Sequence, residues 1–497
     1  MLKRAFVAPD PGRMRLRFAS RAVLGIGLAV ALCGALGHSL VAAVTGGLAA
    51  LLALFTVTDP TVRGQAVTTA LLPAVGLPVL ALAALLHDIP LARDLAFLGV
   101  VGAGVYARRW GPRGHSLGVF GFMTFFAAQF LHTVPGQLPE LYAAVLLSLG
   151  AAAAVRFGVW CYERRLPAPA AVAAPTGGTG LRRITTRQAV QATVGAGFAL
   201  AAGQLLSDQR WYWAVGATWW VFVATTSRGE TVVRGFRRFL GTVLGIVLGF
   251  AVPLHHDPVV AAAVIAVSVF GIFYTAHVSY TWMMLAVTVM ASMLYGLLGV
   301  LDPALLALRV SETAVGALGA ALAVLLVLPV TTHSVTEAWV ERALRCVHAC
   351  TAEAADRLAG RDADPAPRVA ELEAVLGRVR LSLAPLVHPL SPLRHRKGRA
   401  RQVLALLDAC AHEVRGLASV AADPEASHDA RLAAACRRVE SAVEALTVPA
   451  RHPHSVVAAP HPADAELPVL AHLHALERTL VELAVPLRGA GRATLGA

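Results

Sequence analysis

The segment Trp211–Gly245 reads WYWAVGATWWVFVATTSRGETVVRGFRRFLGTVLG, with tryptophan and arginine at opposite ends of an uncharged stretch. Four of its first ten residues are Trp, and no charged residue follows until Arg228. Trp is enriched where a membrane protein meets the lipid–water interface, whereas Arg is enriched in cytoplasmic loops. The segment therefore predicts a membrane helix that starts at the outer surface with Trp211 and Trp213 and leads into a basic inner loop, Arg228–Arg238.

Long uncharged runs occur elsewhere in the chain. Residues 22–58 and 258–301 contain no Asp, Glu, Lys or Arg, and 57% of the 497 residues are hydrophobic. A bilayer core requires roughly 20 apolar residues per helix, so each run has room for two spans and a tight turn. A helix of a soluble protein would instead show a charged face at helical spacing. We therefore predict an all-α polytopic membrane protein.

Hydropathy divides the membrane part into two blocks of six spans. The first repeat is expected at residues 1–165 and the second at 187–332, joined by a Pro/Ala/Gly-rich linker at 166–186. The blocks share an order of features, since TVRGQ (61–65) and TVVRG (231–235) both follow the second span. Because six is even, the repeats would be parallel. The twelve expected spans lie near residues 21–37, 40–58, 65–86, 95–107, 116–132, 139–160, 188–206, 211–226, 237–254, 259–275, 278–299 and 305–329.

The basic residues indicate the orientation. With the amino terminus inside, the inner segments of the membrane part hold 20 Lys and Arg residues, and the outer side holds three, Arg93, Arg210 and Arg309. This positive-inside bias predicts a multi-pass protein of the cell (inner) membrane with both termini cytoplasmic. The net charge of +13 is spread over short loops rather than gathered on one soluble face, so no nucleic-acid partner is expected.

Residues 333–497 have a different composition, with 20 Lys and Arg against 19 Asp and Glu. Apolar residues recur there at helical spacing in about five stretches, which predicts a cytoplasmic helical bundle. Cys346 and Cys350 lie one helical turn apart in CVHAC. Since no second ligand pair follows at a zinc-like spacing, we expect the thiols to pack in a core and no metal to bind. The basic stretch at 394–402 is interpreted as a solvated helix start, with contact to anionic lipid headgroups as the alternative.

Enzyme signatures are missing from the sequence. It contains no nucleophile elbow, Walker phosphate loop, His-Glu-x-x-His motif or dinucleotide fingerprint. We therefore expect no enzymatic activity, no cofactor and no ATP hydrolysis. The adjacent His255 and His256 are interpreted as loop polarity rather than as metal ligands.

Charged residues inside predicted spans are the best candidates for a functional site, because burying them is costly and they usually face a cavity. Arg309 and Glu312 lie three residues apart in the last span, and Glu140 starts the sixth span in the first repeat. An Arg in a cavity would bind a carboxylate, and a nearby Glu could exchange a proton. The alternative is that these side chains reach the lipid–water interface.

Two further groups could contribute to a transport path. Trp219 lies deeper in its span than an interfacial Trp, where it either lines an aromatic-binding cavity or packs between helices. Arg228, Arg234 and Arg238 would raise the local concentration of anions at the inner surface. The glycines at 241, 245 and 249 recur at every fourth position, which is typical of close helix packing.

The stretch 211–249 resembles the signature of fusaric acid resistance proteins and aromatic acid exporters. The matching positions are Trp213, Thr218, Arg228, Gly229, Arg234, Arg238, Gly241, Thr242 and Gly245. The resemblance implies proton-driven efflux of aromatic or other organic acids across the inner membrane, with a small organic anion and the lipid bilayer as partners. Longer family members carry a sizeable cytosolic domain between the membrane halves, where this chain has only the linker.

Three alternatives remain open from the sequence. A major-facilitator-like drug/proton antiporter would also have twelve spans in two parallel halves, but the expected Gly-x-x-x-Asp-Arg-x-Gly pattern is missing. A non-transporting scaffold with a partner-binding tail would place Arg309 and Glu312 against lipid headgroups. An anion channel has no feature that separates it from a carrier. A homo-oligomer is compatible with each reading.

Overall fold

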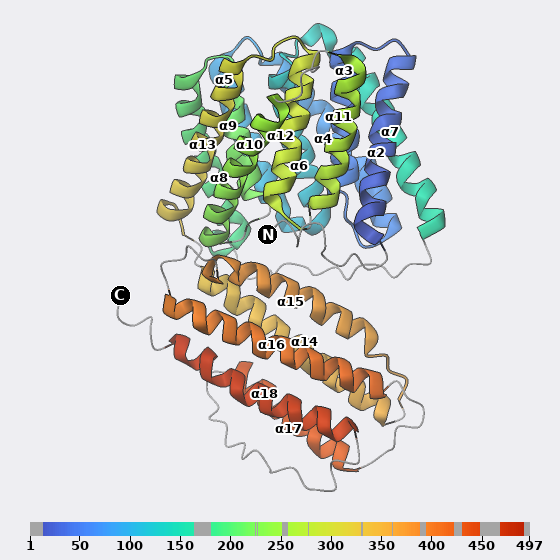
Figure 1. Ribbon diagram of the computed structural model, residues 1–497, viewed down its shortest axis with the longest axis vertical. Helices are drawn as coiled ribbons and strands as arrows, with labels where there is room; N and C mark the ends of the chain where they lie inside the picture. The colour runs from blue at the N-terminus through green and yellow to red at the C-terminus, as the bar shows by residue number, and fades with distance from the viewer. Residues whose placement is uncertain are drawn as a thin grey trace. The chain divides into compact units, whose positions relative to one another are not determined.

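The computed structural model describes residues 13–163, 180–223, 225, 227–250, 257–276, 278–329, 332–359, 361–387, 394–421, 430–447 and 468–491. All regular elements in these ranges are helices (Figure 1). The described residues fall into two compact units, one of residues 13–329 and one of residues 332–491. Most of the predicted linker, and His255 and His256, lie outside the described residues.

The first unit contains long apolar helices, and eight stretches of it are long and apolar enough to cross a bilayer. One of these stretches runs through both α5 and α6, and α3, with 17 residues, is apolar but shorter. The all-α membrane prediction is therefore confirmed. The α-helices are α2 (Met14–Ala35), α3 (Leu40–Thr56), α4 (Val62–Leu85), α5 (Pro90–Tyr106), α6 (Gly111–Phe130), α7 (Leu138–Glu163), α8 (Ile184–Leu206), α9 (Tyr212–Phe222), α10 (Arg228–Phe250), α11 (Pro258–Thr275), α12 (Tyr280–Leu297) and α13 (Pro303–Leu326).

Helix packing follows the same pattern in both halves of this unit. Helices α2, α3 and α7 pack on one another, and so do α8, α9 and α13. In the same way, α6 packs on α4 and α5, and α12 packs on α10 and α11. The halves meet reciprocally, because α5 packs on α8 and α11 packs on α2.

The arginine cluster of the opening segment forms a helix rather than the predicted inner loop. α10 begins at Arg228 and not near residue 237, because the Ser227 hydroxyl caps it by accepting from the Glu230 N–H at 3.4 Å. Arg is also a strong helix former. α9 ends early, at Phe222, and its 11 residues span roughly 16 Å, about half of a bilayer core.

The glycine stripe of α10 packs against α12, as predicted from its spacing. A Cβ added to Gly245 would lie 2.6 Å from Thr288 Cβ and 2.8 Å from the Leu285 carbonyl oxygen. A Cβ on Gly241 would lie 2.6 Å from the Thr281 carbonyl oxygen. Glycine is therefore needed here because the backbones of the two helices approach so closely.

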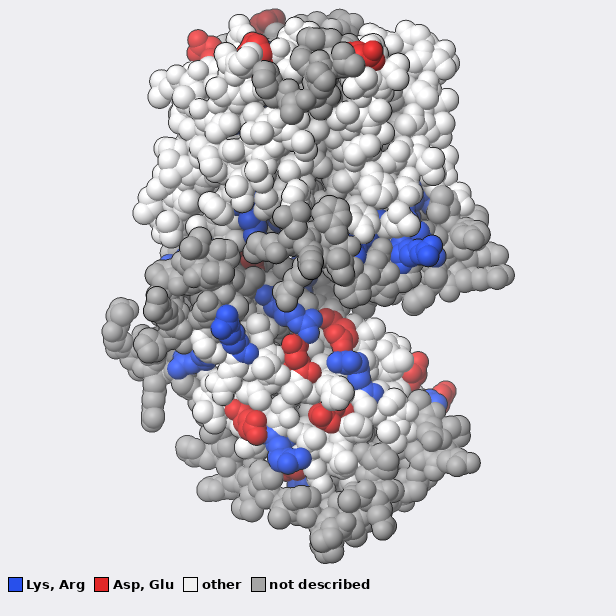
Figure 2. Space-filling model, viewed as in Figure 1, with Lys and Arg blue, Asp and Glu red and all other residues white. Residues whose placement is uncertain are grey.

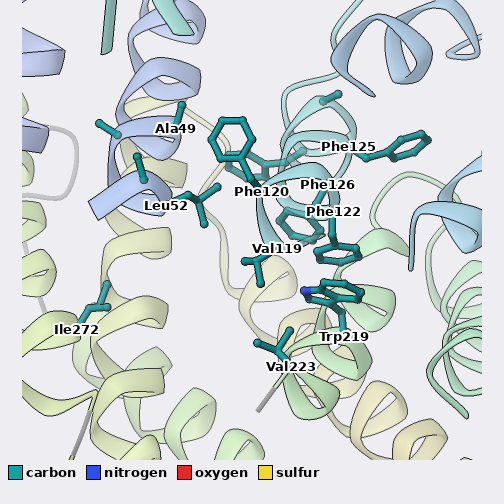
Figure 3. Packing of buried hydrophobic residues seen from close by; sticks show 14 of the residues in the cluster. Ala49, Leu52, Val119, Phe120, Phe122, Phe125, Phe126, Trp219, Val223 and Ile272 are labelled. Atoms are coloured by element: carbon teal, nitrogen blue, oxygen red, sulfur yellow. The ribbon is translucent and has the colours of Figure 1, made fainter. Parts of the chain in front are cut away.

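Aromatic rings from both halves fill the core of the unit (Figure 3). Trp219 stacks on Phe122 with ring centroids 4.2 Å apart. The prediction that Trp211 lies at the lipid–water interface is wrong. Its side chain is 2% exposed, and its ring centroid lies 5.9 Å from that of Phe97. The tryptophans pack inward because neighbouring helices supply Phe side chains with which their rings can pair.

Charge is distributed unevenly over the surface of the membrane unit. Figure 2 shows a broad uncharged side wall, acidic side chains at one end and basic side chains toward the other. The uncharged wall is what a lipid-facing surface requires, because charge in the bilayer core is costly.

The second unit is a helical bundle with a continuous apolar core. Leu344, Leu376, Leu407 and Leu473 are nearly fully buried in it. Cys350 is buried too, and burial raises the pKa of its thiol to about 12. The helices are α14 (Thr332–Leu358), α15 (Ala366–Val387), α16 (Arg394–Ala421), α17 (Ala430–Thr447) and α18 (Pro468–Gly491).

Candidate functional site

Arg309 and Glu312 lie on one face of α13, below its amino-terminal end. The helix begins at Pro303 and is capped by Asp302, whose carboxylate accepts from the Leu305 N–H at 2.6 Å. At 1.5 Å per residue, the two charged residues lie roughly 9 and 14 Å along the helix. Arg309 is 4% exposed and Glu312 is fully buried. Neither therefore faces the headgroup region, so both are candidates for an interior site.

Aromatic rings enclose the Arg309 guanidinium. Its carbon lies 3.3 Å from the centroid of the Trp213 ring, which is a close cation–π contact. The Trp213 ring contacts Phe126 at 4.7 Å, Phe130 at 5.8 Å and Tyr295 at 6.3 Å. Phe126 and Phe130 come from α6 in the first half, whereas the other rings come from α9 and α12. The site therefore lies where the two halves meet.

Several polar atoms of this cluster have no hydrogen-bond partner among the described residues. Both carboxylate oxygens of Glu312 and Nη1 of Arg309 are buried without such a partner. The hydroxyl of Tyr212 is buried without such a partner as well. Buried polar groups are nearly always paired, with protein or with a ligand or ordered water. Because several such unpaired groups lie close together here, a polar or charged ligand bound at this point would be stabilised by hydrogen bonds to them.

Arg234 and Arg238 face the interior of the second half rather than the surrounding water. The Arg234 guanidinium lies 3.7 Å from the Tyr280 ring centroid, and its Nε donates to the Trp220 carbonyl oxygen at 3.1 Å. Arg238 is 6% exposed and donates to the Tyr280 hydroxyl at 3.5 Å. Arg228, at the first position of α10, is exposed. Of these three arginines, Arg228 is the one exposed to the surrounding water.

The cations of the second half form a sequence of interacting charges. Arg238 acts electrostatically on Arg234 and also on Arg309. Arg309 and Arg210 both act on Glu312. Arg210, Arg234, Arg238 and Arg309 are thus linked electrostatically within the second half, with Glu312 as the acidic member.

The early end of α9 leaves carbonyl groups that side chains satisfy. Arg108 Nη1 donates to the Phe222 carbonyl oxygen at 3.1 Å and to the Thr225 carbonyl oxygen at 3.4 Å. Gln188 Nε2 donates to the same Thr225 oxygen at 2.6 Å. Non-helical backbone at membrane depth is tolerated where protein groups satisfy it, and broken helices often border transport sites. Arg108 belongs to the first half, so this contact also joins the halves.

In the first half, an arginine again caps the end of a helix, but the region equivalent to the Arg309 site is apolar. Arg156 donates to the carbonyl oxygens of Val57 at 2.9 Å and Ala53 at 2.7 Å, at the end of α3. Helices α3, α4, α6 and α7 correspond to α9, α10, α12 and α13 of the second half. A cavity of about 20 Å³ lies between α3, α4, α6 and α7. Apolar residues such as Leu52 and Phe120 line most of it. The first half buries Arg156 as a helix cap, whereas a buried Arg and Glu on one helix face occur at the Arg309 site of the second half.

Neither Glu140 nor Trp219 contacts Arg309 or Glu312 directly in the described part of the chain, although Trp219 is linked to Phe126 of the cluster through Phe122. Glu140 accepts from the Ser39 N–H at 2.6 Å, and its carboxylate lies 3.8 Å from Nδ1 of His38. It therefore links the start of α7 to the turn between α2 and α3. Trp219 is 1% exposed and packs on Phe122. For both residues the structure supplies a packing role.

Sequence reasoning missed the residues that complete the cluster, above all Tyr212 and Tyr295. Tyr295 is a single hydroxyl-bearing ring in the uncharged stretch MLYGLL near the end of α12, and a polar group within such an apolar run is a signal for an interior site. Tyr212 lies between two Trp residues, which directed attention to the lipid interface instead. Arg156 is one of the 20 basic residues assigned to inner segments, although it lies within the predicted span 139–160.

A comparison with known families agrees with the resemblance seen in the sequence. Residues 198–346 match the family described as fusaric acid resistance protein-like. The match covers 149 of 497 residues, about 30% of the chain, and includes α9 to α13 with Arg309 and Glu312. The predicted resemblance is confirmed over these residues. No curated protein matches the chain.

Proposed function

We propose that this protein is an inner-membrane exporter of aromatic or other organic acids, driven by the proton gradient. The observation that carries the proposal is the buried pair Arg309 and Glu312, enclosed by aromatic rings and holding unpaired polar atoms. A scaffold would have no need to bury these charges without partners, since burial of an unpaired charge is costly. The match to the fusaric acid resistance protein-like family supports the same class of function.

The proposed topology has twelve spans, α2 to α13, in two parallel repeats with both termini cytoplasmic. The corresponding helix contacts in the two halves support the repeat. The separation of basic and acidic side chains between the ends of the unit supports the orientation, because basic residues favour the cytoplasmic side (Figure 2). α9 and α10 would together cross the membrane twice, with α9 as a half-length span.

In the proposed mechanism, the substrate carboxylate binds the Arg309 guanidinium through charge-assisted hydrogen bonds. The rings of Trp213, Tyr295 and Phe126 would enclose the apolar part of the substrate, and the Tyr hydroxyls would supply further donors. Glu312 would exchange a proton with the outer side as the anion leaves. One side chain thus recognises the charge, and its neighbour on the same helix face couples release to protons.

The conformation described is closed around the site, because Arg309 and Glu312 have almost no exposed surface. Transport would therefore require the halves to separate alternately toward each side. Arg234 and Arg238 lie on the inner part of the proposed path and would receive the anion before Arg309 does. The contacts across the halves, from Phe126 to Trp213 and from Arg108 to Thr225, are those that opening would change.

The test is uptake of a panel of radiolabelled aromatic and aliphatic carboxylates into inside-out vesicles, with and without an imposed proton gradient. The intact protein should accumulate at least one aromatic carboxylate when the vesicle interior is acidic. Arg309→Gln should reduce this uptake about 10- to 100-fold, the loss of one charge-assisted interaction. Arg309→Lys should be intermediate, and Arg63→Gln, at an exposed site, is the control. Unchanged uptake by a correctly inserted Arg309→Gln protein would exclude this site.

A further inference from the structure

A groove of about 420 Å³ opens on the surface of the membrane unit between α5 and α8. Gly102, Ala103 and Tyr106 line it from α5, and Val190 and Val194 line it from α8. The side chains are small or apolar apart from the hydroxyls of Tyr106 and a Thr. The groove is thus a wide apolar channel on the surface, at one of the two seams where the halves meet.

The equivalent seam between α2 and α11 is filled by aromatic side chains. When Pro90 of α5 is aligned with Pro258 of α11, Tyr106 falls opposite Tyr274, and Gly102 falls opposite Phe270. In the α2–α11 seam, Phe273 packs on Phe18 with ring centroids 4.9 Å apart, and Phe55 also contacts Phe273. In the α5–α8 seam, Val105 and Gly102 stand at the positions of Phe273 and Phe270, so the groove is not a general consequence of the repeat.

One end of the groove carries positive charge and interfacial aromatic residues. Tyr106, which lines the groove, accepts a hydrogen bond from Arg109, and the Arg109 guanidinium lies 4.4 Å from the Trp110 ring centroid. Trp110 is 61% exposed, as is typical of a ring at the lipid–water interface. On α8, Arg187 precedes Val190 and Val194 at helical spacing, and its Nε donates to the Leu181 carbonyl oxygen at 2.7 Å.

We propose that this groove is a binding site for an anionic phospholipid of the inner leaflet. One acyl chain lies along Ala103, Val190 and Val194, and the phosphate contacts Arg109 and Arg187. Basic residues between membrane helices on the cytoplasmic side are suited to anionic headgroups, and an apolar groove that continues from them is suited to the chain. The inner-leaflet assignment rests on the proposed orientation, whereas the site itself does not require transport.

The experiment is native mass spectrometry of the full-length protein titrated with phosphatidylglycerol or phosphatidylcholine of the same chains. The protein should retain one phosphatidylglycerol at concentrations at which phosphatidylcholine is lost. Arg109→Gln should weaken that last binding step roughly fivefold, the effect of one surface cation. Ala103→Phe, which places a ring in the groove at an exposed position, should abolish it. Arg63→Gln and Leu95→Phe, at exposed positions outside the groove, are the matched controls.

Each result decides the proposal. Equal affinity for both lipids, or no effect of Arg109→Gln, would show that no anionic headgroup is recognised and would overturn it. A change of oligomeric state in Ala103→Phe with lipid retained would assign the groove to a second copy of the chain. Loss of carboxylate uptake in that variant with lipid binding intact would assign it to substrate entry. Failure of uptake by the intact protein leaves the lipid measurement valid, so the two proposals fail separately.

Discussion

Glu312 is fully buried one helical turn from Arg309, and among the described residues neither of its carboxylate oxygens has a hydrogen-bond partner. Arg309 contacts the Trp213 ring instead of pairing closely with this carboxylate. The Glu312 carboxylate and the Arg309 Nη1 are therefore available to another hydrogen-bond partner in the closed state. At this scale the chemistry of the site rests on two side chains on one helix face.

The first prediction concerns coupling. Glu312→Gln removes the exchangeable proton and preserves shape, so we expect carboxylate exchange across vesicles to persist while acceleration by a proton gradient is lost. Asp208→Asn, an exposed acid in the loop before α9, should retain the full acceleration. Gradient-driven uptake at the normal rate in Glu312→Gln would assign the coupling proton to another group.

Helices α3 and α9 end within the first unit, and arginine side chains occupy their carbonyl ends. Arg156 of α7 donates to carbonyl oxygens at the end of α3. Arg108 of the first half donates to a carbonyl oxygen at the end of α9 in the second half. A helix terminus buried in a membrane protein requires such donors, because lipid cannot supply them. These two arginines therefore stabilise helix ends and are not part of the proposed substrate path.

We expect Arg156→Met to destabilise the protein by about 1–3 kcal/mol, the cost of leaving buried acceptors unsatisfied. Thermal unfolding of the detergent-solubilised protein would show a lower midpoint, and uptake per folded molecule should remain. Arg63→Met is the matched control, because Arg63 lies exposed near the start of α4. Equal midpoints for the two variants would mean that water reaches the α3 carbonyls.

The contact between α10 and α12 gives a second prediction at the scale of elements. Gly245→Val would place a branched side chain within 2.6 Å of the position of Thr288 Cβ, and overpacking of this kind costs about 1–3 kcal/mol. The unfolding midpoint should fall. Gly99→Val is the control, since a Cβ on Gly99 meets no atom within 4 Å. A stable Gly245→Val protein would indicate that the two helices can separate at low cost.

For the whole molecule, the proposed twelve spans predict where each loop lies. Reporter fusions after residues 37, 87, 133, 208 and 300 should report the outer side, and fusions after residues 60, 110, 179 and 330 the cytoplasm. The physical reason is the excess of Arg on the inner segments. A fusion that places the 333–497 unit outside the cell, or an odd number of crossings, would contradict the parallel repeat and remove the basis of the transport path.

The sequence alone determined the membrane character, the apolar helices and the family resemblance, because these depend on composition and on local spacing. It also singled out Arg309 and Glu312, since charge within an uncharged span is conspicuous without any structure. Helix boundaries near the Arg cluster were wrong, because a cap and helix propensity outweighed the charge pattern at Arg228.

Only the tertiary structure decided which of the candidate residues meet. It brought Trp213, Tyr212 and Tyr295 around Arg309, gave Glu140 and Trp219 separate contacts, and turned Arg234 and Arg238 inward. Residues far apart in the chain become neighbours through the packing of whole helices across the two halves. That packing depends on the volume and shape of every facing side chain, which spacing along one helix does not encode.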